Sequence, residues 1–200
     1  MMNHLIIYVN PDKESFSHEI KEYVKKFSLK RGHKVEVRDL YKMNFNPVLS
    51  LEEIKVLEGE EVVDKGEVLE EVAREQKYLE WSDLITFIYP IWWQIPAMMK
   101  GYFDRVFSYG YAYEFKDGRP TGLLPNKPVL KYNPMGTPRE IYEKNGLRKA
   151  YEKAIDSGII NSSGLRVKES ILFGNDPRQN KELRGKYLDE LEESLKRVFD

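Results

Sequence analysis

The chain has 200 residues, 41% hydrophobic and 32% charged, and this size and composition predict one globular domain spanning residues 1–200. Its 32 basic and 33 acidic residues leave a net charge of −1, which argues against nucleic acid or an anionic membrane as the main partner. The sequence has no cysteine, which excludes disulfides, thiolate nucleophiles and cysteine metal sites.

The first half of the chain alternates predicted strands and helices. Residues 5–9, LIIYV, form a short continuous apolar run, typical of a parallel strand covered on both faces. A helix is predicted over 15–31, with apolar residues on one face and Gly32 at its end. Residues 33–40 alternate valines with charged residues and predict a strand with one wetter face, and helical spacing returns over 66–80.

The rest of the chain continues this alternation. Residues 84–89, LITFIY, predict a second fully apolar strand, and Pro96 suits the first position of the helix that follows it. The acidic stretch 51–65 is most simply a solvated connection or a short helix. The remaining predicted elements are strands at 127–132 and 166–173 and helices around 147–155 and 183–198.

Strands that alternate with helices predict βαβ units and a parallel sheet. The first, third and fourth strands are apolar enough to be buried on both faces, whereas the second and fifth are more polar and suit the sheet edges. A strand order of 2-1-3-4-5 places those two at the edges. We therefore expect an α/β fold, a flavodoxin-like three-layer sandwich around a five-stranded parallel sheet.

Three loops meet where such a sheet binds its ligands, beyond the carboxyl ends of the strands. The loop after the first strand offers Ser15 and Ser17 at a helix start, which suits a phosphate group, although one serine could simply cap the helix. This loop contains neither a Walker sequence nor GxGxxG, so a Rossmann-type nicotinamide site is not expected. The three loops are 10–19 (NPDKESFSHE), 90–97 (PIWWQIPA) and 133–140 (NPMGTPRE).

The second and third loops add an aromatic wall and a polar edge. Trp92 and Trp93 could stack on a flat ring, or one of them could fill the corner between helix and sheet. Both tryptophans are not expected to fill that corner, because adjacent residues of an extended segment point in opposite directions. Gly136 and exposed amides could bond the edge of such a ring, or this loop could be only a turn, since Pro134 and Pro138 also form turns. Together, the three features predict a flavin nucleotide.

Residues 89–115, YPIWWQIPAMMKGYFDRVFSYGYAYEF, resemble the signature of the NAD(P)H:quinone oxidoreductases, flavoproteins with a flavodoxin-like fold. The segments 10–19 and 122–138 (GLLPNKPVL…GTP) fall at the expected places, so the resemblance covers about the whole chain. It implies an enzyme, a flavin-dependent NAD(P)H dehydrogenase (quinone), that transfers a hydride from NAD(P)H through the flavin to a quinone or similar acceptor. It also implies a homodimer whose two subunits together complete the substrate pocket.

The resemblance assigns site residues by position. The substrate pocket is assigned to Trp93, Tyr113 and Phe115. No side chain is an obvious acid or base, so no catalytic residue is assigned; Tyr142 could assist proton transfer but better suits helix packing. No metal site is expected, since the three histidines lack metal-ligand spacing. The cofactor-binding residues are assigned as Asn10, Ser15, Phe16, Ser17, Pro90, Ile91, Trp92, Trp93, Asn133, Pro134, Met135 and Gly136.

The chain departs from the family pattern within this set. The family usually has histidine where Asn10 stands and asparagine where Ser17 stands, and members often have two threonines at the positions of Asn133 and Pro134. Proline has no N–H to donate to a flavin, so the amides of Met135 and Gly136 become the expected donors. These changes bear on flavin affinity and redox potential rather than on the fold.

Cofactor, acceptor and location follow as expectations. FMN is favoured because the chain lacks a large C-terminal extension for an adenosine, with FAD as the alternative; NADH and NADPH stay open. Alternative functions are an ancillary flavoprotein subunit of a potassium-efflux system and an azo- or nitroreductase; a flavodoxin-like electron carrier fits the near-neutral charge less well. No apolar run could span a bilayer or act as a signal peptide, so we expect no membrane insertion and a cytoplasmic location.

Overall fold

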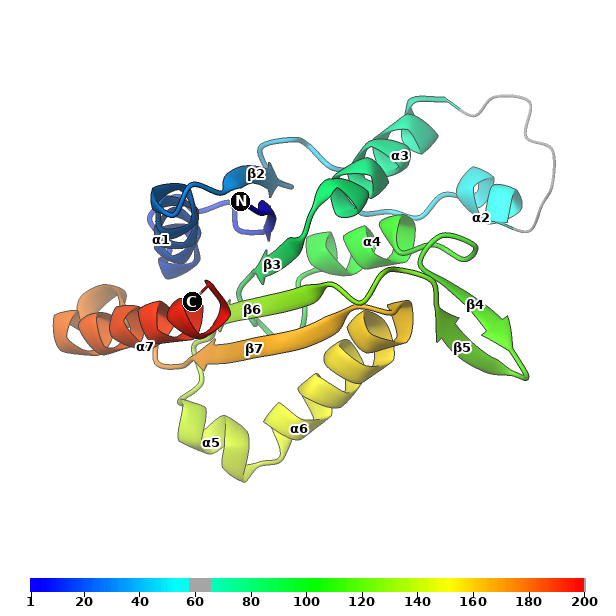
Figure 1. Cartoon of the computed structure of the whole chain (residues 1–200). Coiled ribbons are helices and arrows are strands. Elements are labelled where there is room, and N and C mark those ends of the chain that lie inside the picture. The colour runs from blue at the N-terminus through cyan, green and yellow to red at the C-terminus, as the bar shows by residue number, and fades with distance from the viewer. Residues whose placement is uncertain (58–65, 200) are drawn as a thin grey trace.

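A five-stranded parallel sheet lies at the centre of the computed structural model, which describes residues 1–57 and 66–199. The strands stand in the order β2-β1-β3-β6-β7 (Figure 1). Counted along the chain within this sheet, this is the predicted order 2-1-3-4-5, and the two more polar strands form the edges. The strands are β1 (Asn3–Tyr8), β2 (Lys34–Asp39), β3 (Leu84–Ile88), β6 (Pro128–Pro134) and β7 (Arg166–Phe173).

Helices cover both faces of the sheet, because successive residues of a buried strand point to opposite sides. In β1, Ile6 and Tyr8 pack in the cluster that includes the apolar residues of α1 (Phe16–Lys30) and α7 (Lys181–Phe199). Leu5 and Ile7 pack in the opposite cluster. Figure 1 shows α1 and α7 together on one side of the sheet. The other side carries α3 (Gly66–Trp81), α4 (Ala97–Val106), α5 (Arg139–Lys144) and α6 (Leu147–Glu152). The predicted flavodoxin-like three-layer sandwich is confirmed.

One detail differs from the sequence-based expectations, and in a second the structure decides between two predicted alternatives. Helix α4 begins at Ala97, and Pro96 is its N-cap rather than its first residue, with an extended backbone (ψ 144°). The acidic stretch predicted as a connection or short helix contains α2 (Leu51–Leu57), while residues 58–65 lie outside the described part. Among the described residues, no helix combines the length and the apolar character needed to cross a bilayer.

A β-hairpin that the sequence analysis did not predict extends from the sheet (Figure 1). It consists of β4 (Tyr113–Lys116) and β5 (Arg119–Gly122), joined by Asp117 and Gly118, which both have positive φ (51° and 71°). Positive φ at both central residues is the requirement of a type I′ turn, for which Asp-Gly is a favoured pair. The base of the hairpin packs closely against the backbone at Ser163 and Gly164, since a Cβ at Gly122 would lie 2.2 Å from the Gly164 nitrogen.

A π-helix (Lys153–Ile160) continues α6 where the sequence predicted only an α-helix. It carries Asp156 into an ion pair with Lys131, a fully buried residue of β6. Burial lowers the pKa of Lys131 and raises the pKa of Asp156, and the ion pair between them opposes both shifts. The middle of β6 is thereby tied to the helix layer.

Candidate functional site

A cavity of about 370 Å³ opens at the carboxyl ends of β1, β3 and β6, where the sequence predicted a ligand site. The parallel topology brings the three loops together, because all three strands end at the same edge of the sheet. Ten of the twelve residues assigned to cofactor binding line the cavity; Trp93 and Asn133 do not. The lining residues are Asn10, Pro11, Asp12, Ser15, Phe16, Ser17, Pro90, Ile91, Trp92, Pro134, Met135, Gly136, Asp176 and Arg178.

The loop after β1 is held in shape by its own side chains, which direct the start of α1 at the cavity. The side-chain oxygen Oδ1 of Asn10 accepts the Asp12 N–H at 2.9 Å, and Asp12 Oδ1 accepts the Glu14 N–H at 2.8 Å. Ser15 is the N-cap: its hydroxyl donates to the Asp12 carbonyl oxygen at 2.6 Å and accepts the His18 N–H at 3.2 Å. The structure therefore gives Ser15 the capping role that the sequence left as one of its two roles.

Ser17 is buried, and its hydroxyl accepts a hydrogen bond from the Asn10 side-chain amide at 3.3 Å. The Phe16 ring turns away into the core, where it meets Phe173 edge-on at a centroid distance of 5.6 Å. What the first turn of α1 offers the cavity is thus mainly backbone N–H groups and a hydroxyl. Helix N–H groups of the first turn lack intrahelical acceptors, and the helix dipole adds positive potential, so this end of the cavity suits an anion.

The loop after β3 holds its backbone firmly and leaves its tryptophans in solvent. The Ile91 N–H donates to the Pro134 carbonyl oxygen at 2.7 Å, which extends the pairing of β3 and β6 past the strand ends. Trp92 is 57% exposed and lines the cavity, while Trp93 is 96% exposed and lies outside it. Neither ring plugs the corner between helix and sheet, so that alternative is wrong for both. Trp92 remains available for stacking on a ligand.

In the loop after β6, two of the assigned residues already have partners elsewhere. Asn133 is fully buried; its side-chain nitrogen donates to the Tyr89 carbonyl oxygen at 2.9 Å, and the Tyr151 hydroxyl donates to its oxygen at 3.3 Å. The Met135 N–H donates to the Phe173 carbonyl oxygen at 2.8 Å. The expectation that the Met135 amide faces a ligand is therefore wrong in this structure, which leaves the Gly136 amide as the donor at the cavity.

The residues assigned to the substrate pocket are separated in one chain. Tyr113 and Phe115 lie on the β4–β5 hairpin with their rings 5.8 Å apart, beside a second cavity of about 460 Å³. Phe103 of α4 and Phe107, the residue that caps the end of that helix, also line this cavity. Trp93 lines neither this cavity nor the first. A single chain thus does not assemble the three aromatic residues into one slot.

Tyr142 is not at the site either. It is buried in α5 and packs in the same core cluster as Tyr151, and burial raises the pKa of its hydroxyl. The preference for a packing role over proton transfer agrees with this position. The one exposed aromatic residue among the described residues that line the cavity is Trp92, from the loop after β3.

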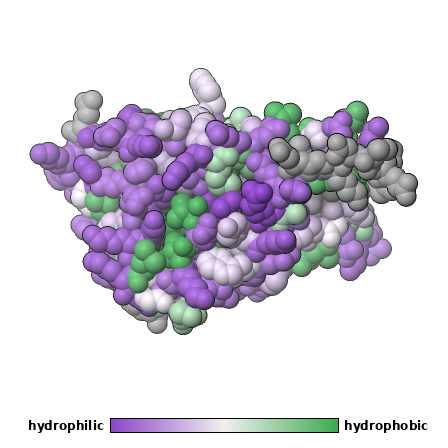
Figure 2. Space-filling view, turned by 90° about the horizontal axis from the view of Figure 1, so that it is seen from above, coloured by the Kyte–Doolittle hydropathy of each residue, from purple (hydrophilic) through white to green (hydrophobic). Residues whose placement is uncertain are grey.

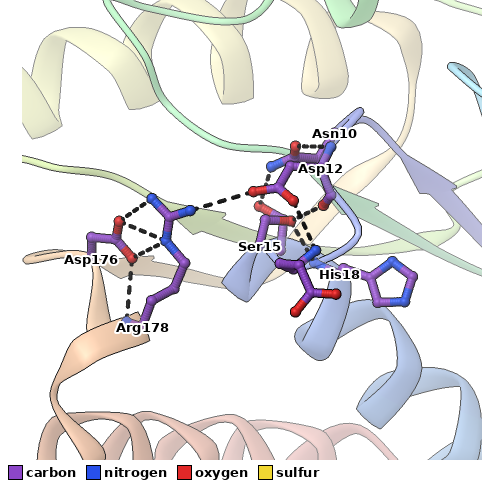
Figure 3. Close-up of polar contacts among 8 residues, drawn as sticks. Asn10, Asp12, Ser15, His18, Asp176 and Arg178 are labelled. Atoms are coloured by element: carbon purple, nitrogen blue, oxygen red, sulfur yellow. Dashed lines mark hydrogen bonds and ion pairs between the residues drawn. The ribbon is translucent and has the colours of Figure 1, made fainter.

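Besides Asp12 in the loop after β1, sequence reasoning missed two charged residues that line the cavity, Asp176 and Arg178. They follow β7 and form an ion pair, with Arg178 Nη2 at 2.5 Å from Asp176 Oδ2, and the arginine lowers the pKa of that carboxyl. Arg178 Nη1 also lies 3.3 Å from Asp12 Oδ2, so it joins the loops after β1 and β7 (Figure 3). A usable signal was present, since β7 must end at the same sheet edge as the other strands.

Comparisons with known proteins agree with this site and fold. The chain matches the model of the flavodoxin-like fold family over residues 2–195. An uncharacterized NAD(P)H oxidoreductase of Haemophilus influenzae is 38% identical over 176 residues, which are 87% of this chain and 84% of that protein. NAD(P)H dehydrogenase (quinone) 1 of Rattus norvegicus is 31% identical over 180 residues, 82% of this chain and 66% of the rat protein. The chain belongs to the flavodoxin-like NAD(P)H:quinone oxidoreductase family.

Several solved structures have folds similar to the fold of this chain. The NAD(P)H:quinone oxidoreductase from Methanothermobacter marburgensis has a TM-score of 0.83, 29% identity and a match covering 95% of each chain. An FMN-dependent NADH-azoreductase from Bacillus anthracis, solved in complex with FMN, has a TM-score of 0.80 at 18% identity over the whole of both chains, a likeness in fold. The resemblance to the quinone oxidoreductases is confirmed.

Proposed function

We propose that this member of the quinone oxidoreductase family is an enzyme that binds FMN in the cavity, oxidises NADH or NADPH and reduces a quinone or a similar flat acceptor. The observation that carries the proposal is the cavity itself. It joins the start of α1, an exposed tryptophan and the Gly136 loop at the carboxyl edge of the sheet. The names of the relatives supply the reaction, and the cavity supplies residues able to support it.

The residues at one end of the cavity fit the phosphate of a flavin nucleotide. The buried Ser17 hydroxyl accepts from Asn10 and keeps its own proton to donate to a ligand. The N–H groups of the first turn and the positive end of the helix dipole, equivalent to about half a unit charge, favour an anion there. FMN would bring one terminal phosphate to this end; FAD is the alternative.

The residues at the other end fit the ring. Trp92 offers a flat face, and a Cβ at Gly136 would meet no atom within 4 Å, so the backbone there is open to a close approach. A bound flavin would supply the transfer of two electrons and a proton between NAD(P)H and the acceptor. The Gly136 N–H would donate to the polar edge of the ring, a fixed dipole that favours negative charge at that edge.

We further propose a homodimer in which the hairpin of one copy completes the substrate slot of the other. Tyr113 and Phe115 lie apart from Trp93 within one chain, and a second copy could bring the two groups together. Offset stacking in such a slot would contribute about 0.5–1.5 kcal/mol per aromatic contact beyond the area buried. A cytoplasmic location is the matching proposal, because NADH and NADPH are intracellular reductants.

The experiment that tests the function is the visible absorption spectrum of the purified protein before and after anaerobic addition of NADH or NADPH, with mass analysis of the released cofactor. We expect a flavin spectrum that bleaches with the nucleotide and returns when a quinone is added. Mass analysis distinguishes FMN from FAD. A bound flavin that does not bleach would overturn the proposed enzymatic activity. A protein that binds neither FMN nor FAD would overturn the proposed cofactor as well.

A further inference from the structure

Arg178 lies at the end of the cavity nearest to the start of α1. It belongs to the short 3-10 helix Pro177–Gln179 that follows β7, and its side chain is 52% exposed. It lines both the main cavity and an adjoining one of about 400 Å³ on the outer side of the first turn of α1. Figure 3 shows its side chain extended from Asp176 toward Asp12. Its guanidinium group thus lies beside the loop that leads into α1.

The two carboxylates hold Arg178 unequally. Asp176 is bound at close range, with Nε at 2.9 Å from both of its oxygens and Nη2 at 2.5 Å from Oδ2. Asp12 is reached only by Nη1, at 3.3 Å, and its other oxygen is fixed by the Glu14 N–H at 2.8 Å. Two short parallel bonds are stronger than one long bond, so Nη1 is the donor most easily transferred to another anion.

Among the described residues that line the main cavity, Arg178 is the only basic one, and Asp12 and Asp176 are the two acidic ones. Without Arg178, a phosphate at this end would face two carboxylates and only the partial charge of the helix start. The nearby Arg184 is held by Glu19 through contacts of 2.6 to 3.0 Å and lines the adjoining cavity only. Arg178 is therefore the side chain best placed to neutralise a bound phosphate.

We propose that Arg178 binds the phosphate group of the flavin, and that Asp12 occupies the same donor until the phosphate displaces it. The proposal rests on the proposed function, in that a flavin fills the cavity, and it names the residue that recognises the phosphorylated end. Asp176 stays hydrogen-bonded to Nε and Nη2 of Arg178 throughout. The guanidinium group therefore stays in place while its Nη1 changes partner. Asp12 is then an internal competitor whose removal strengthens binding.

The test is equilibrium titration of the apoprotein with FMN, FAD and riboflavin, which lacks the phosphate, followed by the quenching of flavin fluorescence at low ionic strength. For the phosphorylated flavin that the wild type binds more tightly, Arg178→Gln should weaken binding about tenfold, the scale of one charge-assisted hydrogen bond. Asp12→Asn keeps the oxygen that accepts the Glu14 N–H and should strengthen binding several-fold. Neither variant should change riboflavin binding, and the control Arg184→Gln should change none of the three.

Three results would overturn the proposal. An equal loss of riboflavin and phosphorylated flavin in Arg178→Gln would mean that the arginine only holds the loops together. Unchanged binding in that variant would remove it from the site, and weaker binding in Asp12→Asn would show that Asp12 does not compete. In each of these cases the flavin still binds the wild type, so the proposed function stands; a wild type that binds none of the three ligands would overturn both.

Discussion

Ser15 and Ser17 stand two residues apart at the start of α1 but have different surroundings. The Ser15 hydroxyl already donates to the Asp12 carbonyl oxygen and accepts the His18 N–H. The buried Ser17 hydroxyl, among the described residues, has one hydrogen bond, which it accepts from the Asn10 side chain. A residue whose hydrogen bonds are all within the fold contributes to stability, and one with a proton left to donate can bind a ligand. The two alanine variants should therefore differ.

We predict that Ser15→Ala lowers the free energy of unfolding of the apoprotein by about 1 kcal/mol, the usual cost of losing an N-cap. Ser17→Ala should instead weaken flavin binding by roughly 1 kcal/mol or more, through one lost hydrogen bond at the phosphate. Urea unfolding and flavin titration of both variants measure the two effects. The assignment fails if Ser17→Ala retains flavin as tightly as the wild type does.

His4 is a second residue with a measurable role, away from the site. It is fully buried in β1, with Nε2 at 2.7 Å from Thr86 Oγ1 and Nδ1 at 3.1 Å from Ser28 Oγ. Burial, with a contribution from His33, lowers its pKa to about 3. The histidine is accommodated in the core because two hydroxyl groups on neighbouring elements satisfy the neutral ring.

This histidine should make the fold sensitive to acid. In the unfolded chain its pKa is about 6.5, so between pH 6.5 and about 3 the unfolded state binds a proton that the folded state does not. The free energy of unfolding should therefore fall with decreasing pH in this window, by up to about 1.4 kcal/mol per pH unit from this group. Urea unfolding between pH 7 and 4 measures the slope. In His4→Gln the slope should be shallower by up to that amount, and an unchanged slope would contradict the assignment.

At the scale of single residues, the sequence identified most of the cavity but not all of it. Loop residues that directly follow β1, β3 and β6 were found, because the strand pattern fixes where those loops meet. Asn133 was included although its side chain points into the core, since a residue at the end of a strand can face either side. Arg178 was missed because its link to Asp12 joins residues 166 positions apart.

At the scale of elements, the loops after β6 and β7 are packed against each other without a gap. A Cβ at Gly174 would lie 2.6 Å from the Arg139 nitrogen and 2.8 Å from the Thr137 carbonyl oxygen, both backbone atoms. No side chain can be accommodated there unless the two loops separate. Gly136 belongs to the loop that would move, so this contact also determines the shape of the cavity.

We predict that Gly174→Ala lowers the free energy of unfolding by about 1–3 kcal/mol, the usual cost of overpacking, and weakens flavin binding as well. The matched control is Gly185→Ala in α7, an exposed position where a Cβ would meet no atom within 4 Å. That variant should gain about 0.5–1 kcal/mol, because alanine favours the helix. Thermal or urea unfolding of the three proteins decides; equal stability of wild type and Gly174→Ala would show that the loops separate freely.

The elements missed by the sequence analysis have separate physical explanations. The hairpin has a readable sequence signal, the pair Asp117-Gly118 between two short segments that can form strands. The π-helix had no such signal, since its apolar spacing matches an α-helix over these few residues. It forms where Asp156 must reach the buried Lys131, a tertiary constraint that a local pattern does not contain.

At the scale of the whole molecule, the strand order was predicted correctly from polarity alone. Strands covered on both faces are continuously apolar and edge strands alternate, and this contrast assigned both edges. The same reasoning does not extend to assembly, because an exposed aromatic residue has the same sequence signature whether it faces solvent, a ligand or another copy. Figure 2 shows a mostly hydrophilic face on which hydrophobic residues gather in small separate patches.

We predict that the protein is a homodimer in solution, with twice the 23.6 kDa mass of one chain by light scattering. The rings of Phe115 and Tyr109, which are 59% and 47% exposed, both contact the ring of Tyr113 and leave an aromatic surface that a second copy would cover in the proposed dimer. Tyr113→Ala should lower the turnover of quinone while flavin stays bound, because in the proposed dimer its ring would belong to the substrate slot, and within one chain it does not line the flavin cavity. A monomer, or unchanged steady-state kinetics of Tyr113→Ala, would overturn the shared slot.

The exposure of Trp92 and Trp93 has an optical consequence. The chain has three tryptophans, and these two lie 57% and 96% in solvent. Indole emission shifts to longer wavelength in water and to shorter wavelength, with loss of intensity, when a flat conjugated ring covers it. The fluorescence emission of the protein without ligand should therefore resemble that of free tryptophan in water. A flat ligand that binds beside the loop after β3 should quench this emission. The two tryptophans thus serve as an intrinsic fluorescent probe, and the occupancy of the site can be measured without a label.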